Sequence, residues 1–172
     1  MRSHLTPKSP LRATQWALYL ALLAAALLAV GCGGNEDIST EPRTLYEAWD
    51  LLANYVDKEG LVFYGYATVE IDAAGKSDDY TLSAYDPDMD ALYVLRARPH
   101  RIRFYSLPHP ERQPTEAIER IQDTPTLVNQ VLEESGRPCS GQLSLGINLA
   151  EERADALCTA PRWAVTVSPY VE

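Results

Sequence analysis

The middle of the chain constrains the fold most, because it reads as one strand after another with short turns between them. Apolar and polar side chains alternate there with the period of two that strands require. Four consecutive strands with short connections predict an antiparallel meander. The expected strands cover residues 61–71, 80–85, 92–98 and 101–107, and the loop of residues 72–79 contains Gly75.

The first expected strand has two distinct faces. The alternation predicts an aliphatic core face, whose members are Leu61, Phe63, Ala67, Val69 and Ile71. Tyr64 and Tyr66 then fall on the opposite face, where they either line a ligand surface or support a second packed layer.

A helix is expected directly before this strand. Thr44 and Glu47 have the spacing of a capping box. Apolar residues then recur at helical spacing, and Gly60 supplies a stop signal. The pattern predicts a helix over about 45–58.

The period of the pattern changes after Pro108. Thr115 and Thr124 can each cap a helix, and Gly136 ends the second of these helices. Further strands are expected at 143–149 and 163–167, and the composition of 150–160 allows a helix between them.

The N-terminus reads as a secretory signal. Residues 1–16 carry Arg2, Lys8 and Arg12 and no acidic residue. The apolar run of residues 16–30 would span about 22 Å as a helix, which is short against a hydrocarbon core of roughly 30 Å. The alternative is an N-terminal membrane anchor that is never cleaved.

The apolar run ends in Leu28-Ala29-Val30-Gly31-Cys32, which resembles the lipobox of bacterial lipoproteins. The resemblance implies cleavage after Gly31 and attachment of diacylglycerol, with fatty acids such as palmitate, to Cys32. Two or three acyl chains give stable membrane attachment, whereas one chain binds reversibly. Because Gly33 and not aspartate follows the cysteine, the resemblance implies the outer membrane if the source is Gram-negative, facing the periplasm or the cell surface.

The chain therefore divides into three parts. We expect a signal peptide over 1–31, a lipidated polar tether over 32–43 and a single globular domain over 44–172. The fold class expected for the domain is α+β. It combines a single antiparallel sheet of about five or six strands with helices packed on one face, after a cleaved N-terminal signal helix.

Two cysteines, Cys139 and Cys158, remain once Cys32 is assigned to lipid. An even pair in an oxidising compartment predicts a disulfide, and two separately buried thiols are the alternative. A long strand followed by a helix would prevent the bridge, because ten strand residues advance about 33 Å and a nine-residue helix returns about 13 Å. We therefore expect a shorter or bent strand, or an extended return over 150–158.

The charge balance argues against two classes of partner. The signal peptide holds three basic residues and no acid, so residues 32–172 carry 12 basic and 24 acidic side chains, a net charge of −12. Such an anionic body argues against nucleic acid, and against anionic lipid bound through general electrostatics.

Four arginines surround the Pro99–His100 connection between the third and fourth strands. Symmetric pairing places Arg98 opposite Arg101, and Arg96 opposite Arg103, all on one face. Because proline cannot adopt the positive φ that favoured two-residue turns need, a longer, four-residue loop is expected. Like charges across a sheet repel, so these arginines either bind an anion or an acidic partner, or form a solvated face paired with the chain's own acids.

No catalytic or metal-binding motif is present. The chain lacks the Gly-x-Ser-x-Gly, P-loop, His-Glu-x-x-His and dinucleotide-binding patterns. The aspartates of residues 86–90 begin like a calcium loop, but Ala91 replaces the required glycine and Ala97 the bidentate acid. We expect no metal and no cofactor, and the sequence nominates no catalytic residue.

The helix, the strands and the segment 92–104 together are similar to the first half of periplasmic lipoprotein carriers and of their outer-membrane receptor. The similarity covers residues 44–107 and implies a half-open barrel over helices that holds acyl chains. The favoured function is a lipid-anchored envelope protein with a non-enzymatic binding or assembly role. The alternatives are a carrier of an apolar or acyl ligand and an uncharacterised periplasmic enzyme.

Overall fold

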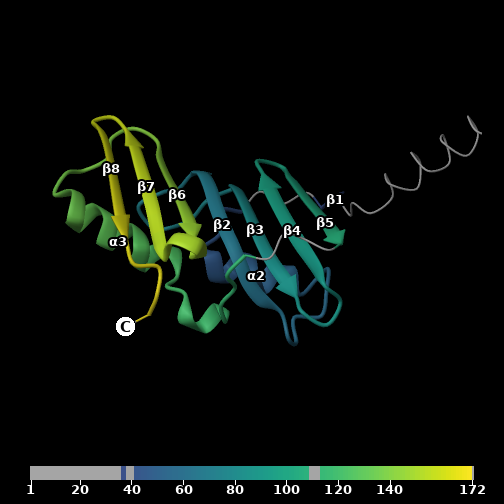
Figure 1. Cartoon of the computed structure of the whole chain (residues 1–172). Coiled ribbons are helices and arrows are strands. Elements are labelled where there is room, and N and C mark those ends of the chain that lie inside the picture. The colour runs from purple at the N-terminus through teal and green to yellow at the C-terminus, as the bar shows by residue number, and fades with distance from the viewer. Residues whose placement is uncertain (1–35, 38–40, 109–112, 172) are drawn as a thin grey trace, which may run out of the picture. The chain divides into compact units, whose positions relative to one another are not determined.

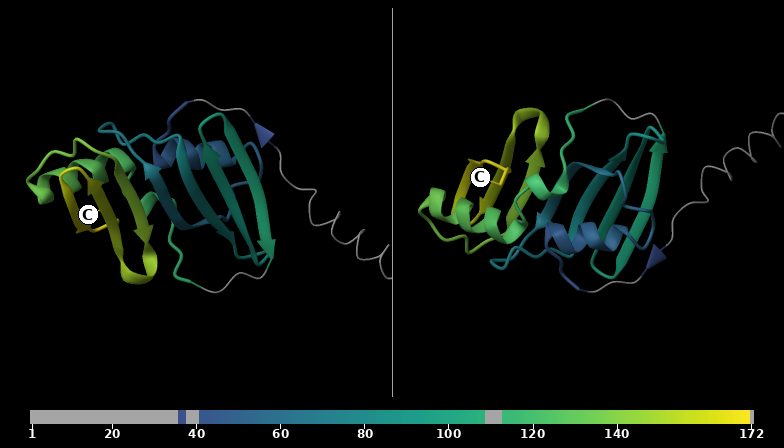
Figure 2. Two further views of the ribbon diagram at one scale, coloured as in Figure 1. Left: turned by 90° about the horizontal axis from the view of Figure 1, so that it is seen from above. Right: turned by 90° about the horizontal axis from the view of Figure 1, so that it is seen from below.

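The computed structural model describes residues 36–37, 41–108 and 113–171. The predicted signal peptide of residues 1–31 and the predicted lipid site, Cys32, lie outside the described residues. The described part is an α+β unit with one open antiparallel sheet and two helices against one of its faces (Figures 1 and 2). The predicted α+β class with one antiparallel sheet is therefore confirmed, whereas the predicted number of five or six strands is too low.

The sheet has seven strands and a two-residue edge strand, β1, in the described part of the chain. Its spatial order is β1-β5-β4-β3-β2-β6-β7-β8. The strands are β1 (Glu36–Asp37), β2 (Val62–Glu70), β3 (Asp79–Asp86), β4 (Ala91–Arg98), β5 (Arg101–Pro108), β6 (Leu143–Asn148), β7 (Arg153–Thr159) and β8 (Arg162–Val167). The helical elements are α2 (Leu45–Leu52), η1 (Ile118–Arg120), α3 (Thr124–Ser135) and η2 (Leu149–Glu151).

The sheet has more strands than predicted because β7 is a strand where a helix was allowed by composition. Ala154, Ala156 and Cys158 alternate along β7 and are all buried. Both edges of β7 are hydrogen-bonded, one to β6 and the other to β8. Pairing on both edges together with burial of one face overrides a weak local preference for helix.

The return of β7 also resolves the conflict over the disulfide. In the β6–β7 hairpin, Cys158 lies opposite Leu143. Leu143 follows Cys139 closely in the sequence, so this pairing brings the two cysteines together. Cys139 and Cys158 form a disulfide, with Cα atoms 5.8 Å apart. The predicted pairing is confirmed, and the extended return is the arrangement that permits it.

A bulge in β2 makes part of the predicted core face wrong: Leu61, Phe63 and Ile71 are buried as predicted, whereas Ala67 and Val69 are exposed. The register to β3 shifts between Phe63 and Gly65, so the side chains after the bulge change faces. Tyr66 is buried as a result, with 3% of its surface exposed, whereas Val69 is 55% exposed. Ile71 is buried again after a second irregularity between Thr68 and Glu70.

Helix α2 begins where the capping box predicts. The Thr44 side chain accepts a hydrogen bond from the Glu47 N–H, and the Glu47 carboxylate accepts one from the Thr44 N–H. The helix ends at Leu52, however, and not near residue 58. The N–H of Ala53 donates a hydrogen bond to the carbonyl of Asp50, three residues earlier. The last turn is therefore of the tighter 3₁₀ type.

Helix α3 begins one residue away from its expected cap. The cap is Asp123, and Thr124 is the first helical residue. The Thr124 hydroxyl is buried and accepts a hydrogen bond from the N–H of Leu45, so it connects the two helices. Gly136 ends α3 in the left-handed conformation, as predicted. The helix expected after Thr115 is only the three-residue η1, because Glu116 pairs with β2 instead.

One continuous cluster of buried side chains lies between the sheet and the helices. Leu45, Trp49 and Leu52 enter it from α2, and the Trp49 and Phe63 ring centroids are 6.4 Å apart. No helix among the described residues is long and apolar enough to cross a bilayer.

Candidate anion-binding surface

The β4–β5 hairpin brings the four predicted arginines together. Arg96 pairs with Arg103 and Arg98 with Arg101 across the hairpin, as the symmetric register predicts. Their neighbours Leu95, Ala97 and Ile102 point to the opposite face and are buried. The four exposed arginines therefore share one face of the sheet, and we call them the arginine surface.

The turn that joins the two strands is shorter than predicted. Because Arg98 and Arg101 are direct partners, only Pro99 and His100 lie between them. The positive φ of 68° falls on His100 and not on Pro99. This is the arrangement that a type II turn uses, with proline first and the left-handed residue second, so proline does not exclude a two-residue loop.

A hollow of about 80 Å³ lies between the four arginine side chains. Such a volume holds several waters, or one carboxylate or phosphate group. On the other side of β4, the neighbour of Arg96 is the uncharged Thr81. No carboxylate of the described residues lies within 4 Å of Arg96 or Arg98, while Arg101 and Arg103 make interactions of their own.

The arrangement favours binding of an oxyanion. Two pairs of like charges face each other across one hairpin, which is unfavourable unless negative charge is nearby. Guanidinium groups hold carboxylates and phosphates through paired N–H donors, and such charge-assisted bonds are about twice as strong as neutral ones.

The same face of the hairpin becomes apolar away from the turn. Tyr105 lies opposite Val94, and Leu107 lies opposite Leu92. Tyr105 and Leu107 are 38% and 46% exposed, so two large side chains with apolar surface lie next to each other at this end of the face. The hairpin face is thus cationic near His100 and apolar near its other end.

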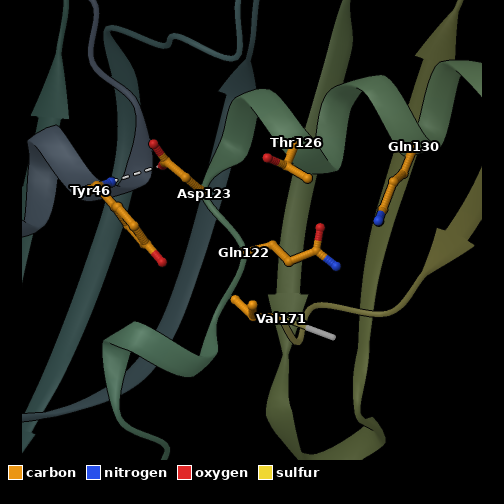
Figure 3. A pocket seen from close by; sticks show the side chains of 6 residues that line it. All are labelled: Tyr46, Gln122, Asp123, Thr126, Gln130 and Val171. Atoms are coloured by element: carbon orange, nitrogen blue, oxygen red, sulfur yellow. Dashed lines mark hydrogen bonds between the residues drawn. The ribbon is translucent and has the colours of Figure 1, made fainter.

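A second hollow, which the sequence did not indicate, lies beside the first turn of α3 (Figure 3). Its volume is about 380 Å³ and it is open to solvent. Its lining comes from α2, from the start and side of α3 and from the C-terminal segment, which are far apart in sequence. The lining residues are Tyr46, Gln122, Asp123, Thr126, Gln130 and Val171.

The polar groups of this hollow mainly hold the chain together. The Tyr46 hydroxyl donates to the Ile121 carbonyl at 2.6 Å, and the Gln122 amide donates to the Tyr170 carbonyl at 2.7 Å. Burial, followed by the negative charges of Asp123 and Glu119, raises the pKa of Tyr46. We therefore assign the hollow a structural role.

No group of three or more histidine, cysteine or acidic side chains in the described ranges is placed to hold a metal ion. In the turn of residues 86–90, the Asp86 carboxylate accepts from the N–H groups of Asp88 and Met89, which stabilises the turn itself.

No family model, no curated protein and no solved structure matches this chain.

Proposed function

We propose that this protein is an envelope lipoprotein, anchored by lipid on Cys32, whose domain is a non-enzymatic binding or assembly module. Its arginine surface binds an anionic group, a carboxylate or phosphate, on a partner that is not nucleic acid. One observation carries the proposal: the cross-strand register gathers four arginines around a hollow on an exposed face. Its location in this proposal is the cell envelope, and the outer membrane if the source is Gram-negative.

Two further features support this proposal. The Cys139–Cys158 disulfide supports export to an oxidising compartment. The continuous buried cluster between sheet and helices supports a surface-binding role over a carrier, since a carrier needs an apolar cavity of several hundred Å³ there.

The anchor is tested by replacing Cys32 with alanine. We expect the variant to lose metabolic labelling with palmitate and to accumulate as a slower-migrating precursor. Labelling that is unchanged in Cys32→Ala would contradict the anchor.

The arginine surface is tested on the full chain in detergent, by measuring how fast phenylglyoxal modifies each arginine. We expect a glutamate-rich peptide to slow modification of Arg96 and Arg98 but not of Arg137 or Arg162, two exposed arginines outside the hairpin. Equal protection of all four would mean that the peptide binds without a defined site.

Affinity for the same peptide provides a second measurement. The double variant Arg96→Gln/Arg98→Gln removes two charge-assisted contacts, so we expect affinity to fall about a hundredfold or more, taking about 1.5–3 kcal/mol for each. The matched variant Arg137→Gln/Arg162→Gln makes the same change in net charge elsewhere and should bind as the wild type does. Equal affinities for both variants would refute the site.

A further inference from the structure

We infer that the arginine surface rests on anionic phospholipid headgroups of the same membrane that holds Cys32. The inference rests on the proposed function, because it requires the lipid anchor, and it names the partner of the same site. It follows from the chain distance to the anchor, from the two chemical characters of the hairpin face and from the separation of charges along it.

The chain distance is short because β1 pairs with the arginine-bearing strand. Glu36 lies opposite Arg103, and Asp37 lies opposite Ile102. Cys32 precedes Glu36 by four residues, which span at most about 14 Å when fully extended. A lipid on Cys32 therefore keeps Glu36 of the edge strand within about 14 Å of the membrane surface, and Arg103, one strand spacing further, within about 19 Å.

The hairpin face has the two kinds of side chain that a membrane interface accommodates. Arginines bind lipid phosphates through paired N–H donors. Tyr105 and Leu107 follow Arg103 on the same face of β5, and both are more than a third exposed. Tyrosine favours the headgroup level, where its ring is half buried and its hydroxyl remains hydrated. The face thus offers phosphate contacts beside a small apolar contact.

The two strands of the hairpin carry no acidic residue, and the acids around them belong to the neighbouring strands: Glu36 of β1 lies opposite Arg103, and Asp79 and Asp86 begin and end β3. Asp86 pairs with Ala91, at the opposite end of β4 from the turn. Five residues separate Ala91 from Arg96, or about 17 Å along a strand. The Debye length at physiological salt is about 8 Å, so the lipid charges near Arg96 are screened from Asp86.

The test uses the full chain, purified from membranes and reconstituted into vesicles. One set of vesicles is pure phosphatidylcholine and the other contains 30 mol% phosphatidylglycerol as a stated test composition, roughly in the range of anionic membranes. Phenylglyoxal modification is followed at each arginine by mass spectrometry. We expect Arg96 and Arg98 to react at least about fivefold more slowly on the anionic vesicles, and Arg137 and Arg162 to react equally on both.

The variant Arg96→Gln/Arg98→Gln then reports docking through Arg103, which stays in the chain. We expect Arg103 to lose most of its protection on anionic vesicles, about fivefold for each arginine removed. In the matched variant Arg137→Gln/Arg162→Gln, the protection of Arg103 should remain. Circular dichroism checks that both variants are folded.

The outcomes separate this inference from the proposed function. Equal modification of Arg96 and Arg98 on the two kinds of vesicle overturns the membrane inference. If a glutamate-rich peptide still protects these arginines in detergent, the proposed function stands with a soluble anionic partner. If neither the peptide nor the anionic vesicles protect them, both proposals fail.

Discussion

Asp123 holds the first turns of both helices, and its replacement tests how the helical layer is assembled. One carboxylate oxygen, Oδ1, accepts from the N–H of Thr124 at 2.9 Å and from the N–H of Tyr46 at 3.0 Å. The first donor begins α3 and the second lies in the first turn of α2. A single side chain therefore satisfies backbone N–H donors of both helices, and Asp123 and Tyr46 are 77 residues apart in the sequence.

The expected cost of Asp123→Ala follows from these two bonds. Loss of one N-cap costs typically about 1 kcal/mol, so loss of both should lower the free energy of unfolding by about 2 kcal/mol. Asp123→Asn is the control, because its amide oxygen can still accept both bonds. It loses only the favourable charge near two helix N-termini, about 0.5 kcal/mol for each.

The assay is equilibrium unfolding in urea, followed by far-UV circular dichroism and tryptophan fluorescence with the disulfide kept oxidised. We expect the midpoint to fall with little change of slope, in the order wild type, Asp123→Asn, Asp123→Ala. If alanine costs less than about 0.5 kcal/mol, or if asparagine costs as much as alanine, the shared cap does not contribute as argued.

Three further changes test other parts of the fold. Gly75→Ala should cost about 3 kcal/mol in urea unfolding, because φ is +75° and a Cβ would lie 2.4 Å from backbone of α3; a loss below 1 kcal/mol would refute this close approach. Replacing Cys139 and Cys158 by serine should cost roughly 3 kcal/mol by opening the loop, measured in the same way, and wild-type stability would contradict it. A hydrogen bond from Lys76, followed by the capping bond, holds the pKa of Glu47 below its ordinary value of 4.5, so wild-type stability falls as pH drops through the lowered pKa. Glu47→Gln should reduce this loss of stability at low pH. An unchanged loss would argue against Glu47 as its cause.

Local patterns predicted much of the strand order and the arginine pairing. Which residues of β4 and β5 face each other depends only on where the centre of the hairpin lies. Arg96 and Arg103 were therefore expected opposite each other for a two-residue or a four-residue loop. The turn itself was predicted wrongly, because the positive φ was assigned to Pro99 and not to His100. Side-chain parity is a property of the strand, whereas turn type depends on one or two dihedral angles.

Other errors arise from pairing and packing with other elements, which a local pattern does not report. The bulge between Phe63 and Gly65 reverses the faces of the middle of β2, and no alternation of residue types reports a shift of one residue in a partner strand. The strand β7 was read as a possible helix because its alanines favour one. The hollow around Gln122 gathers residues from three segments and has no motif of its own.

The sequence alone determined the features that need only neighbouring residues: the capping box of α2, the glycine end of α3, the antiparallel meander and the two opposed arginine pairs. The lipobox resemblance at Cys32 belongs to the same class and stays a prediction. Tertiary structure decided which face of β2 is buried, that β7 is a strand, that Asp123 serves two helices, and that β1 lies beside Arg103. The physical reason is that bulges, added strands and shared caps depend on hydrogen bonds and burial outside the segment itself, and the energies of these contacts outweigh local preferences of a few tenths of a kcal/mol per residue.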